Sequence, residues 1–122
     1  MKKILLVDDS KTMLMSMEGI LKRSGFEVST AESGTEALGK LGGFKPDLII
    51  SDLNMPEMDG IEFIKQAKTL PEMRFKPVLM LSTESKQNKR DEAKAAGATG
   101  WLVKPVQPND FISVVKQVLP GA

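Results

Sequence analysis

The stretch Ile49-Ile50-Ser51-Asp52-Leu53-Asn54-Met55-Pro56 decides how the rest of the chain is interpreted. A short apolar run ends in the carboxylate of Asp52, and a proline and an Asp59-Gly60 turn signal follow. Continuous apolar runs of this length are typical of strands buried on both faces of a parallel sheet. In open α/β sheets, ligands bind outside the carboxyl ends of the strands. Asp52 is therefore the candidate reactive residue.

Short apolar runs and amphipathic stretches alternate along the whole chain. Strands are predicted at residues 4–7, 27–31, 48–51, 78–81 and 101–103. Helices are predicted at 12–24, from Ser33 to 41, from Asp59 to 67, at 86–96 and from Pro108 to 118. We expect Gly42-Gly43 to end the second helix. Short connections favour right-handed βαβ units, and these give one doubly wound parallel sheet in a single α/β domain.

Composition removes several classes of chemistry. The chain has 17 Lys plus Arg against 16 Asp plus Glu, so nucleic acid is not expected as an electrostatic partner. Without cysteine or histidine, the chain cannot form disulfides, a Ser-His-Asp triad or a typical zinc site. No apolar segment approaches the roughly 20 residues that span a bilayer, and the N-terminal run is too short for a signal peptide. We expect a cytoplasmic protein with no membrane insertion.

Polar side chains end four of the predicted strands. They are Asp8-Asp9, Asp52, Ser82-Thr83 and Lys104. Each has an ordinary alternative, as a helix cap, a turn residue or a solvated lysine, but together their chemistry is complementary. Three carboxylates within 4 Å repel one another by roughly 4 kcal/mol per pair, and Mg²⁺ is the cation that suits such oxygen ligands. With a lysine and a hydroxyl to bind equatorial oxygens, these residues indicate a phosphoryl-transfer site, with Asp52 as the acceptor.

The same residues resemble those of the response-regulator receiver domain, and among its members the single-domain chemotaxis regulators related to CheY. The resemblance covers the chain and rests on Asp8-Asp9, Asp52-x-Asn54-Met55-Pro56-x-Met58-Asp59-Gly60, Ser82, Trp101 and Lys104-Pro105. It implies a flavodoxin-like, CheY-like sheet of five parallel strands with five helices. The strand order 2-1-3-4-5 is taken from CheY itself. It also implies one receiver domain over residues 1–122, without an output domain.

The resemblance assigns a role to each site residue. Asp52 would accept a phosphoryl group from a histidine kinase of the CheA type. Asp9, Asp52 and the backbone carbonyl of Asn54 would hold Mg²⁺, with Asp8 acting through bound water. Lys104 would contact the phosphoryl group, and its peptide bond to Pro105 is expected to be cis.

A switch is implied as well. Ser82 would move toward the phosphoryl oxygens and Trp101 would follow it inward, which would reshape the face formed by the fourth helix, fifth strand and fifth helix. Trp101 stands where the best-known chemotaxis regulators have tyrosine, and core packing is its alternative role. Asn54 and Glu84 would tune hydrolysis of the aspartyl phosphate. The strongly charged stretch 86–94 is either a solvated helix or a docking face for an acidic partner.

The function expected is therefore a monomeric signalling switch rather than an enzyme, with self-phosphorylation and autodephosphorylation chemistry. Its target would be a downstream protein such as the flagellar motor switch, and a phosphatase is a further candidate partner. A phosphorelay intermediate or a phosphate sink would need the same residues. A Mg²⁺-dependent phosphatase of the haloacid dehalogenase type would carry a second Asp at position 54, where this chain has Asn54. In a flavodoxin-like FMN carrier, Asp8-Asp9 would repel the phosphate.

Overall fold

A computed structural model describes residues 2–83 and 86–119 of the 122-residue chain. Its strands are β1 (Lys3–Val7), β2 (Glu27–Ala31), β3 (Leu48–Asp52), β4 (Val78–Ser82) and β5 (Gly100–Val103). Its helices are α1 (Lys11–Arg23), α2 (Gly34–Phe44), α3 (Gly60–Ala67), α4 (Gln87–Ala96) and α5 (Pro108–Val118), and a short 3₁₀ helix (Pro71–Met73) precedes β4. The sheet has the order β2-β1-β3-β4-β5 and is parallel throughout. The predicted fold class is confirmed.

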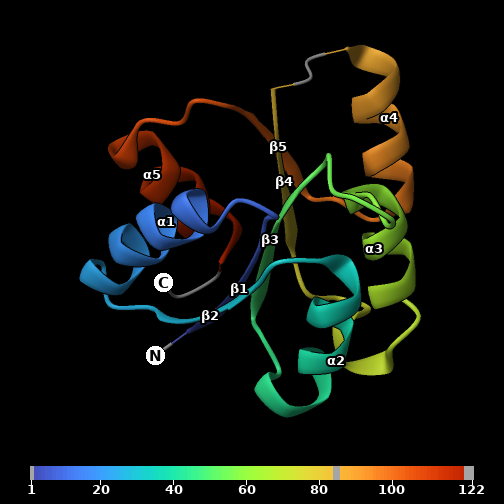
Figure 1. Ribbon diagram of the computed structural model, residues 1–122, viewed down its shortest axis with the longest axis horizontal. Coiled ribbons are helices and arrows are strands. Elements are labelled where there is room, and N and C mark those ends of the chain that lie inside the picture. The colour runs from blue at the N-terminus through green and yellow to red at the C-terminus, as the bar shows by residue number, and fades with distance from the viewer. Residues whose placement is uncertain (1, 84–85, 120–122) are drawn as a thin grey trace.

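The helices form two layers around the sheet. Figure 1 shows α1 and α5 on one face, and α2, α3 and α4 on the other. Alternate residues of a strand point to opposite faces, so the apolar strands contribute to two cores. Ile4 and Leu6 pack with Phe111 in the core under α1 and α5, while Leu5 and Val7 pack with Phe63 in the core under α2, α3 and α4. This explains why the strands are continuously apolar rather than alternating.

Burial differs between the centre and the edges of the sheet. All five positions of β3 and of β4 are buried, whereas β2 is buried only at Ala31 and β5 at none of its positions. The last residues of β3 and β4 are therefore shielded from solvent. That placement applies to Asp52 and Ser82, which are the last residues of these two strands.

Three helices begin at capping side chains, two of which, Ser33 and Asp59, are the predicted first residues of their helices. The side-chain oxygens of Ser10, Ser33 and Asp59 accept hydrogen bonds from the backbone N–H groups three residues later, at 3.2, 3.0 and 2.9 Å. Such bonds satisfy donors that a helix start otherwise leaves open. The caps fix where α1, α2 and α3 begin, and hence the length of the loops that leave β1 and β3.

The predicted end of α2 is wrong. The helix passes through Gly42 and Gly43 and ends at Phe44, where Lys45 adopts the left-handed conformation with φ 52°. Phe44 packs against the core beneath α2, and the ammonium group of Lys3 lies 5.6 Å from the centre of its ring. This tertiary packing compensates for the low helix propensity of two glycines, which amounts to about 1 kcal/mol each.

The outer faces of the helices are largely polar. Among the described residues, the exposed large apolar side chains are Met15, Phe75 and Val103. No helix in the same part of the chain has both the length and the apolar character needed to cross a membrane. Within residues 2–83 and 86–119, the other large apolar side chains are at least partly covered, most of them in the two cores.

Candidate functional site

The carboxyl ends of β1 and β3 bring three aspartates together. Asp8 and Asp9 directly follow β1, and Asp52 is the last residue of β3, the strand that pairs with β1. One carboxylate oxygen from each lies within 4.8 Å of the others. Asp8 and Asp52 are buried, while Asp9 is exposed. The predicted convergence of these three side chains is therefore observed.

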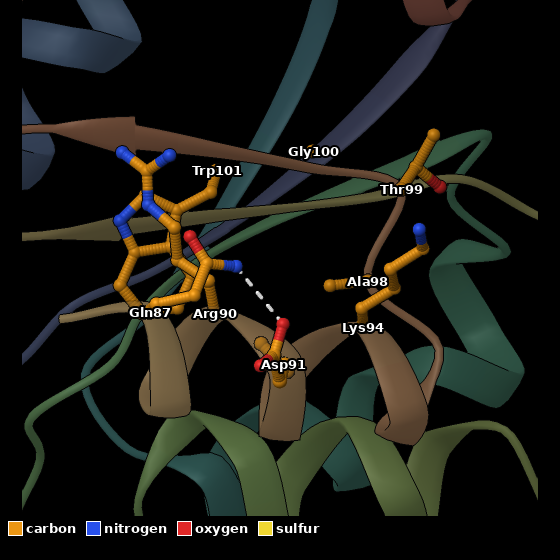
Figure 2. A pocket seen from close by; sticks show the side chains of 9 residues that line it. Gln87, Arg90, Asp91, Lys94, Ala98, Thr99, Gly100 and Trp101 are labelled. Carbon is orange, nitrogen blue, oxygen red and sulfur yellow. Dashed lines mark hydrogen bonds between the residues drawn. The ribbon is translucent and has the colours of Figure 1, made fainter. Parts of the chain in front are cut away.

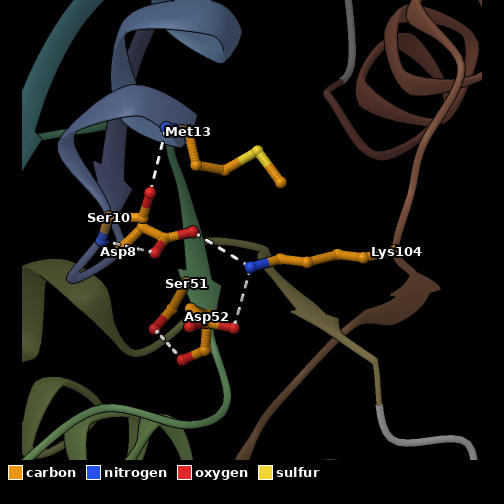
Figure 3. Close-up of polar contacts among 6 residues, drawn as sticks. All are labelled: Asp8, Ser10, Met13, Ser51, Asp52 and Lys104. Atoms are coloured by element: carbon orange, nitrogen blue, oxygen red, sulfur yellow. Dashed lines mark hydrogen bonds and ion pairs between the residues drawn. The ribbon is translucent and has the colours of Figure 1, made fainter.

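Lys104 reaches the same cluster from the loop after β5. Its ammonium nitrogen lies 3.1 Å from Asp8 Oδ2 and 3.1 Å from Asp52 Oδ1, so it bridges two of the carboxylates (Figure 3). Only 15% of the Lys104 side chain is exposed. The Lys104–Pro105 peptide bond is cis, as predicted. The backbone N–H of Lys104 also donates to the carbonyl of Ser82 at 2.8 Å, which joins this loop to the end of β4.

Backbone hydrogen bonds hold the cluster in place. The N–H of Ser10 donates to Asp8 Oδ1 at 2.9 Å, and the Ser51 hydroxyl donates to the backbone carbonyl of Asp52 at 3.0 Å (Figure 3). The N–H of Leu53 donates to the carbonyl of Leu81 at 2.9 Å. Since the carboxylates sit on strand ends tied to their neighbours, their mutual distances are set by the sheet.

Gly60 contributes to this site in a way that its turn signal does not reveal. A Cβ atom at Gly60 would lie 2.4 Å from the carbonyl oxygen of Asp52 and 3.0 Å from Met80 Sδ. The start of α3 therefore approaches the backbone of Asp52 more closely than any other residue type would allow. The sequence indicates a turn at Asp59-Gly60, but only the packing shows that it supports the reactive residue.

The electrostatics of the cluster are unfavourable for Asp52. Its burial raises the pKa of its carboxyl group above the ordinary value, the charge of Asp8 raises it further, and Lys104 only partly offsets this. For Lys104, burial alone would lower the pKa, but hydrogen bonds and charge interactions with Asp8 and Asp52 outweigh it, so the pKa is raised. The lysine therefore stays charged, and the negative charge of Asp52 is not fully compensated.

The donor set is suited to a hard divalent cation. Three carboxylate oxygens lie close together, one of them on an exposed residue, and no nitrogen or sulfur ligand is among them. Mg²⁺ prefers one or two carboxylates together with water molecules and substrate oxygens. A cation here would also relieve the repulsion that raises the pKa of Asp52. The residues thus fit the predicted Mg²⁺ site.

The other predicted site residues differ in burial and in their position in the fold. Ser82 is fully buried at the end of β4, next to the strand of Asp52. Asn54 is exposed, two residues beyond Asp52. Trp101 lies on β5, where it pairs with Met80 of β4. Its side chain is half-buried beside α4 and is not part of the carboxylate cluster. Glu84 lies outside the described residues.

The chain is similar to many known proteins. A family model described as the response regulator receiver domain matches residues 4–116. The alkaline phosphatase synthesis transcriptional regulatory protein PhoP of Bacillus subtilis is 38% identical over 118 residues, which are 97% of this chain and 48% of that protein. The transcriptional regulatory protein PrrA of Mycobacterium leprae is 38% identical over 96% of this chain and 49% of its own length. The chain thus spans about half the length of these curated relatives.

Solved structures extend the similarity over whole chains. The Vibrio cholerae chemotaxis protein CheY4 superposes with a TM-score of 0.95 and 45% identity, covering 98% of this chain and 99% of that one. The signal receiver domain of a signal transduction histidine kinase from Syntrophus aciditrophicus has a TM-score of 0.90 and 34% identity, covering 100% of this chain and 92% of that one. These relatives include a chemotaxis protein, transcriptional regulators and a receiver domain of a kinase, so proteins with different named roles are each similar to nearly all of this chain.

Proposed function

The chain belongs to the response regulator receiver domain family, and from this premise we propose that Asp52 accepts a phosphoryl group from a histidine kinase. Receiver domains take phosphoryl groups from such kinases and act on downstream targets. The observation that supports Asp52 is its position: a buried carboxylate at the end of the central strand, 3.1 Å from Lys104 and beside two more aspartates.

The reaction that suits this geometry is transfer from a phosphohistidine. An oxygen of the Asp52 carboxylate attacks phosphorus, the phosphorus–nitrogen bond breaks, and the imidazole leaves with the electron pair and takes up a proton. The product is an acyl phosphate. A Mg²⁺ ion held by Asp9, Asp52 and the Asn54 carbonyl, with Asp8 acting through water, would neutralise phosphoryl charge when bound.

Lys104 would stabilise the negative charge on the phosphoryl group during transfer. Its ammonium group already lies at the reacting carboxylate and needs to turn only from Asp52 Oδ1 to a phosphoryl oxygen. A preorganised cation at developing negative charge is the main way in which proteins accelerate phosphoryl transfer. Ser82 would then donate its hydroxyl to another phosphoryl oxygen, and Trp101 would move inward to alter the surface of α4, β5 and α5. Exposed Asn54, together with Glu84, would tune hydrolysis of the phosphorylated state.

The experiment that tests this proposal uses acetyl phosphate with Mg²⁺, followed by intact-mass measurement. The wild-type chain should gain one labile phosphoryl group. Asp52→Asn should gain none, while Asp47→Asn, which changes the aspartate at the other end of β3, should label like the wild type. Equal labelling of Asp52→Asn and wild type would contradict the assignment.

For the biological role, we propose a chemotaxis response regulator, a single receiver unit over residues 1–122 that acts through its own surface. The support is the likeness to CheY4, which is higher in identity than the likeness to PhoP or PrrA and covers both chains almost fully. The proposed partners are a kinase of the CheA type, the flagellar motor switch and a phosphatase. A phosphorelay intermediate or phosphate sink is the alternative.

Two outcomes separate these roles. In a chemotaxis regulator, affinity for the flagellar motor switch protein of the same organism should rise on phosphorylation. In a relay intermediate or a sink, the phosphoryl group should pass to or from a histidine phosphotransfer protein, with no gain in affinity for the motor switch. Measuring both with one phosphorylated preparation decides between them.

A further inference from the structure

A pocket of about 190 Å³ lies between α4 and β5, away from the carboxylate cluster. Figure 2 shows Arg90 and Trp101 together at one end of it, and Lys94 toward the other end, near Ala98 and Thr99. The indole of Trp101 is half-buried and packs against the core beneath α3 and α4. The wall of this pocket is therefore a charged helix on one side and the only tryptophan of the chain on the other.

The guanidinium group of Arg90 lies against the indole. Its central carbon is 5.9 Å from the centre of the Trp101 ring, within the range of a cation–π contact. Within the part of the chain that the structure describes, Arg90 Nε is buried and has no hydrogen-bond partner. A buried donor without a partner is costly, so the ring contact must offset part of that cost.

The neighbouring acids of α4 are already engaged elsewhere. Asp91 accepts a hydrogen bond from Gln87 Nε2 at 2.9 Å, and Glu92 pairs with Lys89 at 3.4 Å. Neither of these two contacts includes Arg90. The side chain that the structure places against Arg90 is thus an aromatic ring, which holds a cation without the strong directional bonds of a carboxylate.

We propose that Arg90 is a positioning residue, which holds Trp101 in its resting place and so opposes the inward movement of the indole. The proposal rests on the proposed function, in which Trp101 moves once Asp52 carries a phosphoryl group. The contact of Arg90 with the face of the ring is one interaction that holds the indole beside α4.

The contact is connected to the phosphoryl site through two strands. Trp101 pairs with Met80 in the sheet, Val103 pairs with Ser82, and Lys104 donates its N–H to the carbonyl of Ser82. A contact that exists only in the resting state must be broken on activation. Its loss should therefore raise the population of the inward state and the affinity for an activating ligand by the same factor.

The test compares Arg90→Gln, Arg90→Lys and Lys94→Gln as full-length proteins. Lys94→Gln is the matched control, because Lys94 lines the same pocket at a distance from the indole. The first readout is the indole N–H resonance of Trp101 by NMR, without any phosphoryl analogue. The second is the dissociation constant of beryllofluoride, a mimic of an aspartyl phosphate, in the presence of Mg²⁺.

Arg90→Gln should move the indole resonance toward its beryllofluoride-bound position. It should also tighten beryllofluoride binding by about two- to fivefold, the lower end of the range for cation–π contacts. Arg90→Lys should lie between Arg90→Gln and the wild type, because an ammonium group restores part of the contact. Lys94→Gln should match the wild type in both readouts.

Three results would overturn the proposal. The first is an Arg90→Gln resonance at the wild-type position, and the second is a shift equal to that of Lys94→Gln. The third is beryllofluoride affinity that stays the same or weakens in Arg90→Gln. Failure of the proposed function looks different, since the wild-type protein itself would then not bind beryllofluoride, and the coupling to Trp101 would fall with it. The resonance measured without beryllofluoride would still show whether Arg90 holds the indole.

Discussion

The two ends of β3 carry an aspartate each, in opposite electrostatic environments. Asp47, just before the strand, accepts the backbone N–H of Lys3 at 2.8 Å and pairs with Lys76 at 3.5 Å. These interactions, the backbone hydrogen bond first, hold the pKa of Asp47 below its ordinary value. Asp52, at the other end, is buried among carboxylates, and burial and the charge of Asp8 raise its pKa.

The contrast shows which end of the sheet is built for stability and which for a ligand. The charge of Asp47 is satisfied by the protein itself, so it contributes to folding. The charge of Asp52 is only partly satisfied by Lys104, so the cluster retains unfavourable energy that a bound cation can release. Perturbed carboxylates are common at functional sites for this reason.

The largest effect is expected from the lysines that accompany the two aspartates. Lys104→Met removes the cation beside the reacting carboxylate and should slow labelling by acetyl phosphate about a hundredfold or more. Lys76→Met removes the lysine that pairs with Asp47 and should leave the labelling rate within about twofold of the wild type. Comparable losses in both variants would show that Lys104 acts through stability and not through chemistry.

How far the site could be predicted depends on whether the signal is local. The five strands and the helix starts at Ser33 and Asp59 follow from short patterns, and the structure confirms them. The end of α2 does not, because the packing of Phe44 outweighs the two glycines before it.

Contacts between distant strands lie beyond local patterns. The contact of Lys104 with Asp8 and Asp52 depends on the strand order, which the resemblance supplied and local patterns could not. The contact of Arg90 with Trp101 was not predicted, because it depends on how α4 lies against β5.

A second prediction concerns the backbone that supports Asp52. Gly60→Ala would place a methyl group 2.4 Å from the Asp52 carbonyl and should lower the free energy of unfolding by about 1–3 kcal/mol. Gly42→Ala is the control: a Cβ there meets nothing within 4 Å, and alanine in a helix should raise stability by about 0.5–1 kcal/mol. Chemical denaturation measures both. An unchanged Gly60→Ala protein would mean that α3 can retreat from the strand end at little cost.

A third prediction uses the cation. At ten times its dissociation constant, Mg²⁺ should stabilise the wild-type protein by about 1.4 kcal/mol, since it binds only the folded state. Asp47→Asn should show the same gain in thermal melts, and Asp52→Asn a smaller one. If Mg²⁺ leaves the wild-type melting temperature unchanged, the three aspartates do not form a metal site.

The most direct test of the contrast is the free energy of unfolding of Asp47→Asn and Asp52→Asn, measured without divalent cations between neutral pH and pH 3. Because the pKa of Asp47 is lowered on folding, its stabilisation is present above the ordinary value of 3.8 and is lost as the pH falls through its folded pKa. Asp47→Asn should therefore be less stable than the wild type at pH 7, by about 0.5–1.5 kcal/mol, and the deficit should shrink as the pH falls toward 3. For Asp52 the sign reverses, since its raised pKa means that the charged form destabilises the fold as the pH rises through that pKa. Asp52→Asn should be more stable than the wild type at pH 7 and should lose this advantage as the pH falls. A less stable Asp52→Asn protein at pH 7 would contradict the account.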